Sequence, residues 1–372
     1  MMIYNVIVFI TLLFGVIYAS LLFMFAYGIL KHRRDAFKSG FEKFSVIVAA
    51  RNEEAHIAEL IERLAVQNYP RDSYEIIIVN DDSSDSTMDI INKYSHIENL
   101  KALNSKEYIL EGIIGKKKAL QIGIEQSSYE MLVFTDADCL PEADWLLEIN
   151  RHIDEETDFV CGYSPLMMKQ NGIISGLKNL ERASIFAVGS GSFGLKTAIT
   201  CTARNMVYRK SNWEKVGRFS KIGHIASGDD DLMLLLQRKE IRKYNFMFSQ
   251  SSIVPAIEDK DLKAQMHQET RRGSKFKYYP LYLKFICLMT FIFYLGLLAS
   301  FCLVIADFYY LPVFIGFLLI KLIPEFVLLT VFLSKVKRLK YLVMMPLAEL
   351  IYIPYFVFFG LKGTFGGYKW KN

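Results

Sequence analysis

The chain has 372 residues, of which 52% are hydrophobic and only 22% charged, with a net charge of +5. This composition excludes a disordered or low-complexity chain and indicates membrane-embedded segments beside a folded domain. The positive excess is too small to predict a nucleic-acid partner, and it fits basic residues beside a membrane or around an anionic substrate. The five cysteines include no CxxC pair, so they support neither a disulfide framework nor a zinc site, and we expect a reducing compartment.

The first apolar segment lies at the N-terminus, over residues 3–30, and it carries no charge. It exceeds the about 20 residues that a helix needs to span a bilayer. Its basic residues, Lys31 to Arg34, follow the apolar run, whereas a signal peptide has them before a shorter run. The segment therefore predicts an anchor, and the positive-inside rule places residue 31 onward in the cytoplasm.

Three more apolar stretches occur near the C-terminus, over residues 282–306, 310–333 and 341–360. The last contains Glu349 and two prolines, so the sequence leaves open whether it crosses the membrane. It also leaves open whether these helices only anchor the chain or shape a route for a lipid or polymer. We predict an anchor at 3–30, a cytosolic domain at 31–280, membrane helices at 281–360 and a basic tail at 361–372. The expected location is the inner cell membrane, as a multi-pass protein.

Between these segments, short apolar runs alternate with helical patterns. The runs cover residues 44–50, 75–79, 100–103 and 131–135, and each is apolar along most of its length. Strands of this kind, alternating with helices, predict an α/β fold with a mostly parallel sheet that is covered on both faces. Ligands of such sheets bind at the carboxyl ends of the strands. Acidic clusters follow the second and the fourth run.

The cluster after the fourth run, Asp136-Ala137-Asp138, predicts a metal site. Two carboxylates this close repel each other, and burial adds to the cost unless a cation is bound. Hard oxygen donors suit Mg²⁺ or Mn²⁺. Aspartate and serine are also favoured in turns and at helix starts, and for residues 83–87 we favour that structural explanation.

Two other classes of protein place acids after an apolar strand. A metal-dependent adhesion site needs DxSxS, but Asp85 stands where the second serine belongs. An aspartyl phosphatase needs DxDx(T/V), but Leu140 stands at the last position. Each of these readings therefore fails at one residue.

Two charged segments follow later in the chain, and each has a structural and a functional explanation. Residues 227–231 (SGDDD) precede the apolar helix predicted over 232–236. A helix N-terminus favours acids, and one of them could alternatively be a general base. Residues 268–275 (QETRRGSK) would form either a basic patch beside anionic lipid or a cationic clamp on a phosphate leaving group.

Taken together, these motifs resemble a membrane-bound family 2 glycosyltransferase with the GT-A, Rossmann-like fold. Residues 45–54 (SVIVAARNEE) resemble the family's first strand and turn, residues 79–87 its nucleotide-base contact, and residues 115–123 (GKKKALQIG) its donor-site segment. The resemblance implies that the donor nucleotide is bound by Ala50, Asn52, Glu53, Asp81, Lys116 and Asp136.

The remaining motifs imply the metal, the base and the acceptor region. Residues 134–138 resemble the family's DxD, which implies a divalent cation, Mg²⁺ or Mn²⁺, on Asp136 and Asp138. The Asp229-Asp230 pair stands where the family has Glu-Asp, which implies Asp230 as the catalytic base. Residues 202–209 and 268–272 resemble segments near the acceptor and the diphosphate, where the resemblance implies roles for Asn205, Asp229, Gln268, Arg271 and Arg272.

The implied activity is inverting transfer of a sugar from a nucleotide-sugar to a membrane-associated lipid or saccharide acceptor. We expect a UDP-sugar as the donor. One alternative is a processive polysaccharide synthase, which Arg272 disfavours because it replaces the tryptophan of the family's Q-x-x-R-W segment. Another is a membrane protein that binds a nucleotide-sugar without turnover.

Overall fold

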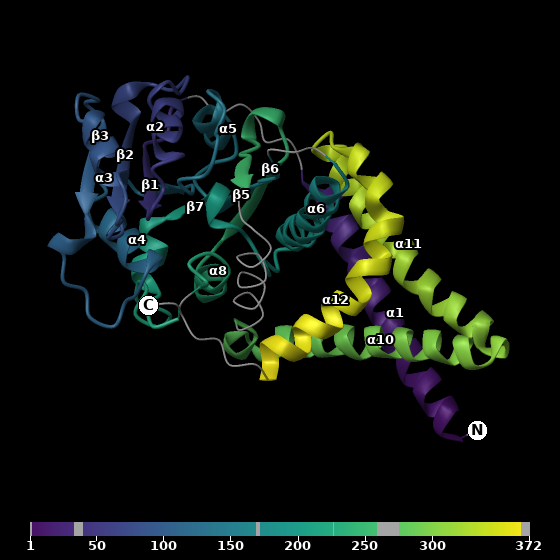
Figure 1. Ribbon diagram of the computed structural model, residues 1–372. Coiled ribbons are helices and arrows are strands. Elements are labelled where there is room, and N and C mark those ends of the chain that lie inside the picture. Colours follow the sequence, from purple (N-terminus) through teal and green to yellow (C-terminus); the bar gives the residue numbers. More distant parts are fainter. Residues whose placement is uncertain (1, 33–39, 169–171, 226, 259–274, 366–372) are drawn as a thin grey trace.

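The computed structural model describes residues 2–32, 40–168, 172–225, 227–258 and 275–365. An α/β domain lies beside a group of long apolar helices, and helix α6 lies between the two parts (Figure 1). The fold predicted from the sequence, a mostly parallel sheet with one N-terminal and three C-terminal apolar helices, is confirmed.

The central sheet has seven strands in the order β3-β2-β1-β4-β7-β5-β8. Strand β7 is antiparallel to both neighbours, and the other pairs are parallel. In the β1–β2 register Ala50 faces Asn80, so the carboxyl ends of these strands are level. The strands are β1 Phe44–Ala50, β2 Tyr74–Asn80, β3 Leu100–Asn104, β4 Met131–Phe134, β5 Thr157–Gly162, β7 Met206–Arg209 and β8 Lys243–Met247. A separate parallel pair consists of β6 Leu166–Met168 and β9 Ala256–Glu258.

The sheet is covered on both faces, and the central strands β1, β2 and β4 are buried along most of their length. Val46 and Val48 of β1 belong to the core that includes α2 (Ile57–Ala65), α3 (Thr87–Lys93) and α5 (Trp145–Arg151). Ile77 of β2 packs on the other face, against α4 (Lys116–Glu125). Successive side chains of a strand point to opposite faces, so a continuous apolar run serves both layers.

The second half of the domain joins the sheet to the long helices through α6 (Ile173–Gly194). Phe193 of α6 packs edge-on against Phe159 of β5. On the other side α6 crosses α1 closely, since a Cβ atom on Gly191 would lie 2.4 Å from the Phe25 backbone oxygen. The domain is completed by α7 Lys210–Lys215 and α8 Asp231–Gln237, and by the short helices η1 Arg71–Ser73, η2 Ser105–Glu107, η3 Ala203–Asn205, η4 Gln250–Ser252 and η5 Lys275–Tyr278.

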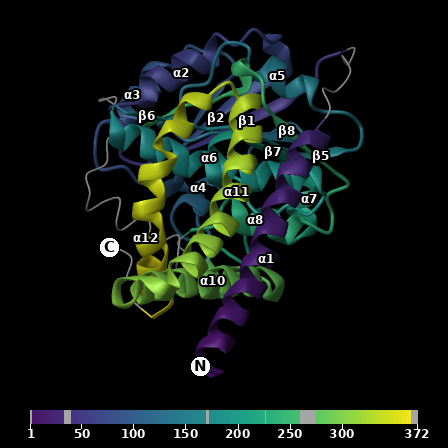
Figure 2. The same cartoon turned by 90° about the vertical axis from the view of Figure 1, so that its right-hand side faces the viewer.

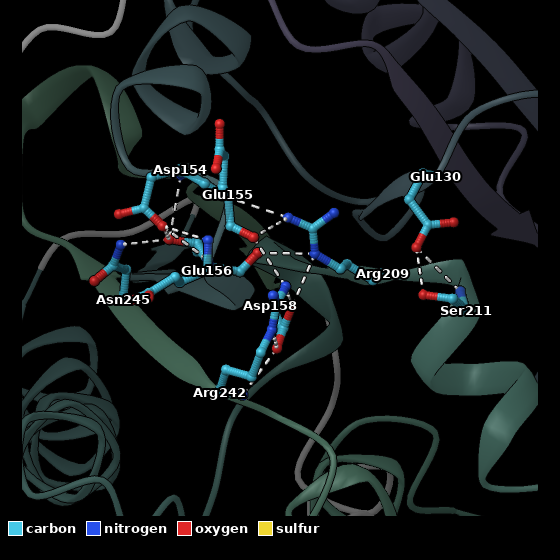
Figure 3. A network of polar contacts seen from close by, with 10 residues as sticks. Glu130, Asp154, Glu155, Glu156, Asp158, Arg209, Ser211, Arg242 and Asn245 are labelled. Carbon is cyan, nitrogen blue, oxygen red and sulfur yellow. Dashed lines mark hydrogen bonds and ion pairs between the residues drawn. The ribbon is translucent and has the colours of Figure 1, made fainter.

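A charged cluster fastens β5, β7 and β8 together at the end of β7 away from η3 (Figure 3). Its centre is Asp158, a buried residue whose carboxylate accepts bonds from Arg209 at 2.8 Å and from Arg242 at 2.6 Å. Burial alone would raise the pKa of Asp158, but the bonds and charge of Arg242 lower it. Arg209 ends the segment 202–209, so the last residue of that motif has a structural partner.

Among the described residues, four helices are long and apolar enough to cross a membrane. They are α1 Met2–Lys31, α10 Leu281–Ala306, α11 Leu311–Lys335 and α12 Met345–Phe365. The short helix η6 Phe308–Tyr310 precedes α11, and η7 Leu339–Met344 precedes α12. The four long helices gather on one side of the α/β domain (Figure 2). The stretch whose crossing the sequence left open is helical, and its candidate span covers Leu339–Phe358.

Charged residues inside these helices face one another. Lys321 of α11 is 2% exposed and forms ion pairs with Glu325 at 2.8 Å and with Glu349 of α12. Tyr294 of α10 donates to Glu325 at 3.2 Å, and Tyr18 of α1 donates to the same carboxylate. The cluster therefore links all four helices, and intramembrane charges are tolerated in such a paired, inward-facing arrangement.

Candidate active site

The candidate site lies at the carboxyl ends of β1, β2 and β4, where the acidic clusters were predicted. The loop after β1 and the loop after β2 are bonded to each other. The Ala50 carbonyl accepts the backbone N–H of Asp81 at 2.7 Å. Asn52 has a positive φ of 55°, which asparagine tolerates better than most residues, and its side-chain oxygen accepts the N–H of Ser84 at 2.8 Å. Asn52 therefore shapes the two loops.

Asp81 and Glu53 are the acids of this edge. Asp81 is 7% exposed, and burial raises its pKa while Arg51 and Lys118 oppose the shift. Burial also raises the pKa of Glu53, and the negative charge of Asp138 adds to the effect. The first two loops thus stand next to the DxD residues, as the sequence predicted.

Two cations hold the DxD residues. Lys116, at the start of α4, lies 2.6 Å from Asp136 and 2.9 Å from Asp229. Arg204 of η3 lies 3.3 Å from Asp136 through its Nε atom and 3.2 Å from Asp138 through a terminal nitrogen. Burial alone would raise the pKa of Asp136, but Lys116 and Arg204 together lower it. Three of the residues expected from the sequence, Lys116, Asp136 and Asp229, therefore meet.

Arg204 is a site residue that the sequence reasoning missed. Its side chain is 9% exposed, and its backbone oxygen accepts a hydrogen bond from the Thr135 hydroxyl at 3.1 Å. Its NH1 atom has no hydrogen-bond partner among the described residues. Two neighbouring carboxylates need a cation nearby, and the sequence reasoning assigned that role to a metal ion alone and not to an arginine as well. The position of Arg204 next to Asn205, in a motif assigned to the site, was the available signal.

The carboxylates of Asp136 and Asp138 fit a divalent cation. Both face one guanidinium group, so their oxygens point toward a common centre. Mg²⁺ typically takes one or two carboxylates and completes its shell with water and substrate phosphates. No cluster of three or more His, Cys, Asp or Glu residues with metal-binding geometry occurs in the part of the chain that the structure describes. The residues thus suit a cation that shares its ligands with a bound diphosphate.

Asp230 precedes α8 and accepts the backbone N–H of Asp231 at 2.7 Å, as an N-cap residue does. Its carboxylate lines a cavity of about 250 Å³, here named the α6 cavity, which α6, β5, β8 and the residues before α10 enclose. Burial raises the pKa of Asp230 to about 7. The negative charges of Asp231 and Asp229 add to this increase, and the positive charge of Lys275 opposes it. An acid with a pKa near neutrality is suited to accept and release protons.

Asp231, the third acid, is held in place by residues that precede α10. Lys275 lies 2.6 Å from its carboxylate, and the Tyr279 hydroxyl donates to it at 3.0 Å. Lys275 is farther from Asp230, at 3.9 Å. The sequence did not single out this arrangement, which joins the start of α8 to the start of a membrane helix.

The two neighbouring lysines of α4 have different partners. While Lys116 enters the site, Lys117 is buried and donates to the backbone oxygens of Ile225 and, at 2.9 Å, Ser227. Burial lowers the pKa of Lys117 to about 8, although Asp229 and Asp230 oppose the shift. Lys117 therefore supports the loop that carries Asp229.

Asn205 lies behind the site and not in it. It is fully buried, accepts a hydrogen bond from the Trp145 indole at 3.0 Å and donates to the Ser252 carbonyl at 2.7 Å. Its amide is therefore occupied by partners within the protein core, and its role in the acceptor region stays a prediction. Gln268, Arg271 and Arg272 lie outside the described residues, so their roles stay predictions.

A mostly parallel sheet, with two joined loops, a DxD pair and a buried acid at the carboxyl ends of its strands, is the arrangement of a GT-A-type domain. Over 93% of this chain and 99% of the other, the fold is similar to that of the mannosyltransferase PcManGT from Pyrobaculum calidifontis, solved with GDP-Man and Mn²⁺, with a TM-score of 0.55 and 17% sequence identity. Residues 45–217 match the model of Glycosyl transferase family 2. These residues are therefore a domain of that family, in agreement with the resemblance found in the sequence.

Two curated relatives are similar to the chain in sequence. The chain is 28% identical to the probable glycosyltransferase YdaM of Bacillus subtilis over 244 residues, which cover 63% of this chain and 56% of the relative. It is 30% identical to the poly-beta-1,6-N-acetyl-D-glucosamine synthase of Staphylococcus epidermidis over 180 residues, covering 47% of this chain and 42% of the relative. The chain thus spans about half the length of these relatives.

Proposed function

We propose that the protein is a membrane-anchored, inverting glycosyltransferase that moves a sugar from a nucleotide-sugar to a membrane-associated lipid or saccharide acceptor. The observation that carries this proposal is the placement of two consecutive acids. Asp229 is ion-paired with Lys116 beside the DxD residues, whereas Asp230 lines the α6 cavity with a raised pKa. A direct displacement needs such an arrangement, in which the donor lies on one side of the catalytic base and the acceptor lies on the other.

On the donor side, the loops after β1 and β2 would bind the nucleotide, and Asp81 would face its nucleobase. Lys116 and Arg204 would attract the diphosphate oxygens, and the unpartnered NH1 atom of Arg204 supplies a buried donor for one of them. A divalent cation on Asp136 and Asp138 would further neutralise the diphosphate. Charge stabilisation of a departing group is usually a large part of catalysis in such sites.

On the acceptor side, Asp230 would take the proton of the attacking hydroxyl. The bond from the sugar's anomeric carbon to the diphosphate oxygen breaks while the bond to the acceptor oxygen forms, and the electron pair leaves with the nucleotide diphosphate. Attack from the side opposite the leaving group inverts the anomeric centre. The raised pKa of Asp230 makes its carboxylate a stronger base than an exposed aspartate.

The expected donor is a UDP-sugar, and the expected location is the inner cell membrane with the α/β domain in the cytoplasm. The location is supported by the four candidate spans and by the basic residues at their ends next to the domain, such as Lys31 and Lys335. Positively charged loops favour the cytoplasmic side.

A processive polysaccharide synthase is the second candidate, because one similar relative is named as a synthase. A single transfer yields one product of fixed size, whereas a synthase yields a ladder of lengths. Gel or mass analysis of the product distinguishes these activities. A protein that only binds nucleotide-sugars would bind the donor without releasing nucleotide.

The first experiment measures nucleotide release by the detergent-purified full chain from a panel of nucleotide-sugars, with and without Mn²⁺ or Mg²⁺. We expect metal-dependent release from one donor, reduced about 10²- to 10³-fold in Asp138→Asn, the loss typical of removing one charge-stabilising group. The matched control is Asp89→Asn, an exposed acid on α3, which should retain full activity. Equal activity in Asp138→Asn and the control would remove Asp138 from the site.

A further inference from the structure

The α6 cavity adjoins the donor side through one peptide unit. Asp229 contacts Lys116 within the DxD cluster, and the next residue, Asp230, forms part of the cavity wall. Consecutive Cα atoms are about 3.8 Å apart, so the cavity wall and the DxD side of the site are adjacent along the chain at this point. The cavity is thus placed where an attacking hydroxyl is needed.

The size of the cavity restricts its occupant. Its volume of about 250 Å³ is below the ~300–1,000 Å³ typical of ligand pockets. The space therefore suits a compact group, such as a sugar ring or a glycerol unit.

The charges around the cavity are balanced. Two cations, Arg182 and Lys275, line it together with two acids, Asp230 and Asp231. Lys275 is ion-paired with Asp231 at 2.6 Å, and the Arg182 Nε atom donates to the Ser164 carbonyl at 3.0 Å. The rest of the lining is uncharged and includes hydroxyl, thiol and aromatic groups. Such a lining favours an uncharged polyol over a phosphate.

The cavity also adjoins the membrane helices. Ile185 and Phe186 of its wall belong to α6, which packs on α1. Tyr279 of its wall directly precedes Pro280, the N-cap of α10. In the first turns of α10, Leu281 and Phe285 are 84% and 58% exposed, so apolar side chains follow Tyr279 closely along the chain.

We propose that the α6 cavity binds the uncharged, hydroxyl-bearing headgroup of a membrane lipid and presents one of its hydroxyls to Asp230. The apolar tail of the lipid would lie along the start of α10. This inference rests on the proposed function and specifies its acceptor. The chemistry is shared by glycerol headgroups and by neutral glycolipids.

The test supplies four acceptor probes to the detergent-purified full chain with its donor. They are diacylglycerol, monoglucosyl-diacylglycerol, a polyprenyl phosphate and free glucose, and transfer of labelled sugar is measured for each. We expect transfer to at least one of the two neutral lipids, and the active one identifies the headgroup. Transfer only to the polyprenyl phosphate or only to glucose would overturn the inference.

Cavity-filling variants show whether the α6 cavity is the place of binding. Thr200→Phe fills the cavity, and Val66→Phe, which adds the same ring at a 65% exposed position outside the cavity, is the control. We expect Thr200→Phe to lower lipid transfer at least about 10-fold, the scale of steric discrimination in a pocket, with nucleotide affinity and acceptor-free nucleotide release unchanged. Val66→Phe should behave like the unmodified chain. Equal lipid transfer in both variants would overturn the inference.

Ile185→Trp provides a second variant if Thr200→Phe does not fold, because Ile185 is 39% exposed and tolerates a larger side chain. The same loss of lipid transfer is expected. Donor turnover with rejection of every neutral lipid would overturn this inference alone. If no nucleotide-sugar binds to the unmodified chain, the proposed function fails as well.

Discussion

The two sides of the candidate site shift the pKa values of two neighbouring acids in opposite directions. On the donor side, Lys116 and Arg204 neutralise the carboxylates, and the pKa of Asp229 is held well below its usual range, although burial opposes this. On the cavity side, Asp230 lies 3.9 Å from Lys275, and burial raises the pKa of Asp230 to about 7. Distance to a cation therefore decides which of two consecutive aspartates is a fixed charge and which can exchange a proton.

The largest expected effect comes from removing the exchangeable acid. Asp230→Asn should lower sugar transfer by about 10²- to 10⁴-fold, the usual contribution of a general base, while nucleotide binding is retained. Transfer rate and nucleotide affinity measured on the same preparation separate chemistry from binding. A variant with normal transfer would show that Asp230 is only the N-cap of α8, and the comparison between the two sides would fail.

The pH dependence sharpens the comparison. Because a base must be ionised to accept a proton, and the pKa of Asp230 is raised to about 7, the rate should fall as the pH drops below 7. The expected fall is about tenfold per pH unit, or roughly 100-fold at pH 5. The measurement is kcat/KM from pH 5 to 9. A flat profile over this range would assign the base to another group, and the residual activity of Asp230→Asn should lack this acid limb.

The smallest expected effect concerns the donor side and needs no turnover. Arg204 occupies the space between the two DxD carboxylates, so Arg204→Gln should bind Mn²⁺ roughly tenfold more tightly without nucleotide, a change of about 1.4 kcal/mol. Electron paramagnetic resonance of free Mn²⁺ measures this affinity directly. Arg63→Gln, whose arginine pairs with Glu59 on α2, is the matched control and should leave the affinity unchanged. Unchanged or weaker binding in Arg204→Gln would show that Arg204 does not compete with the cation.

The sequence predicted the scaffold because its signals are local. The apolar runs at 44–50, 75–79, 100–103 and 131–135 became β1 to β4 within one or two residues, since a buried parallel strand must be apolar on both faces. The long apolar segments became the four candidate spans because length and composition decide whether a helix can cross a bilayer.

The candidate site was predicted only in part. The meeting of Lys116, Asp136 and Asp229 followed from the motifs. The different partners of Lys116 and Lys117, adjacent in a run of lysines, could not be read from the sequence, because the helix turn and its packing decide which one faces the site. The partners of Asn205 could likewise not be read from the sequence, since they come from distant segments of the chain.

By itself, then, the sequence determined the first four strands, the candidate spans and the resemblance to the family, all of which depend on residue type and spacing along the chain. The tertiary structure alone decided that Arg204 stands between the DxD carboxylates, that Lys275 pairs with Asp231 more closely than with Asp230, and that a cavity opens beside Asp230. The physical reason is that burial and Coulomb energy depend on distances between groups far apart in sequence, and packing sets those distances.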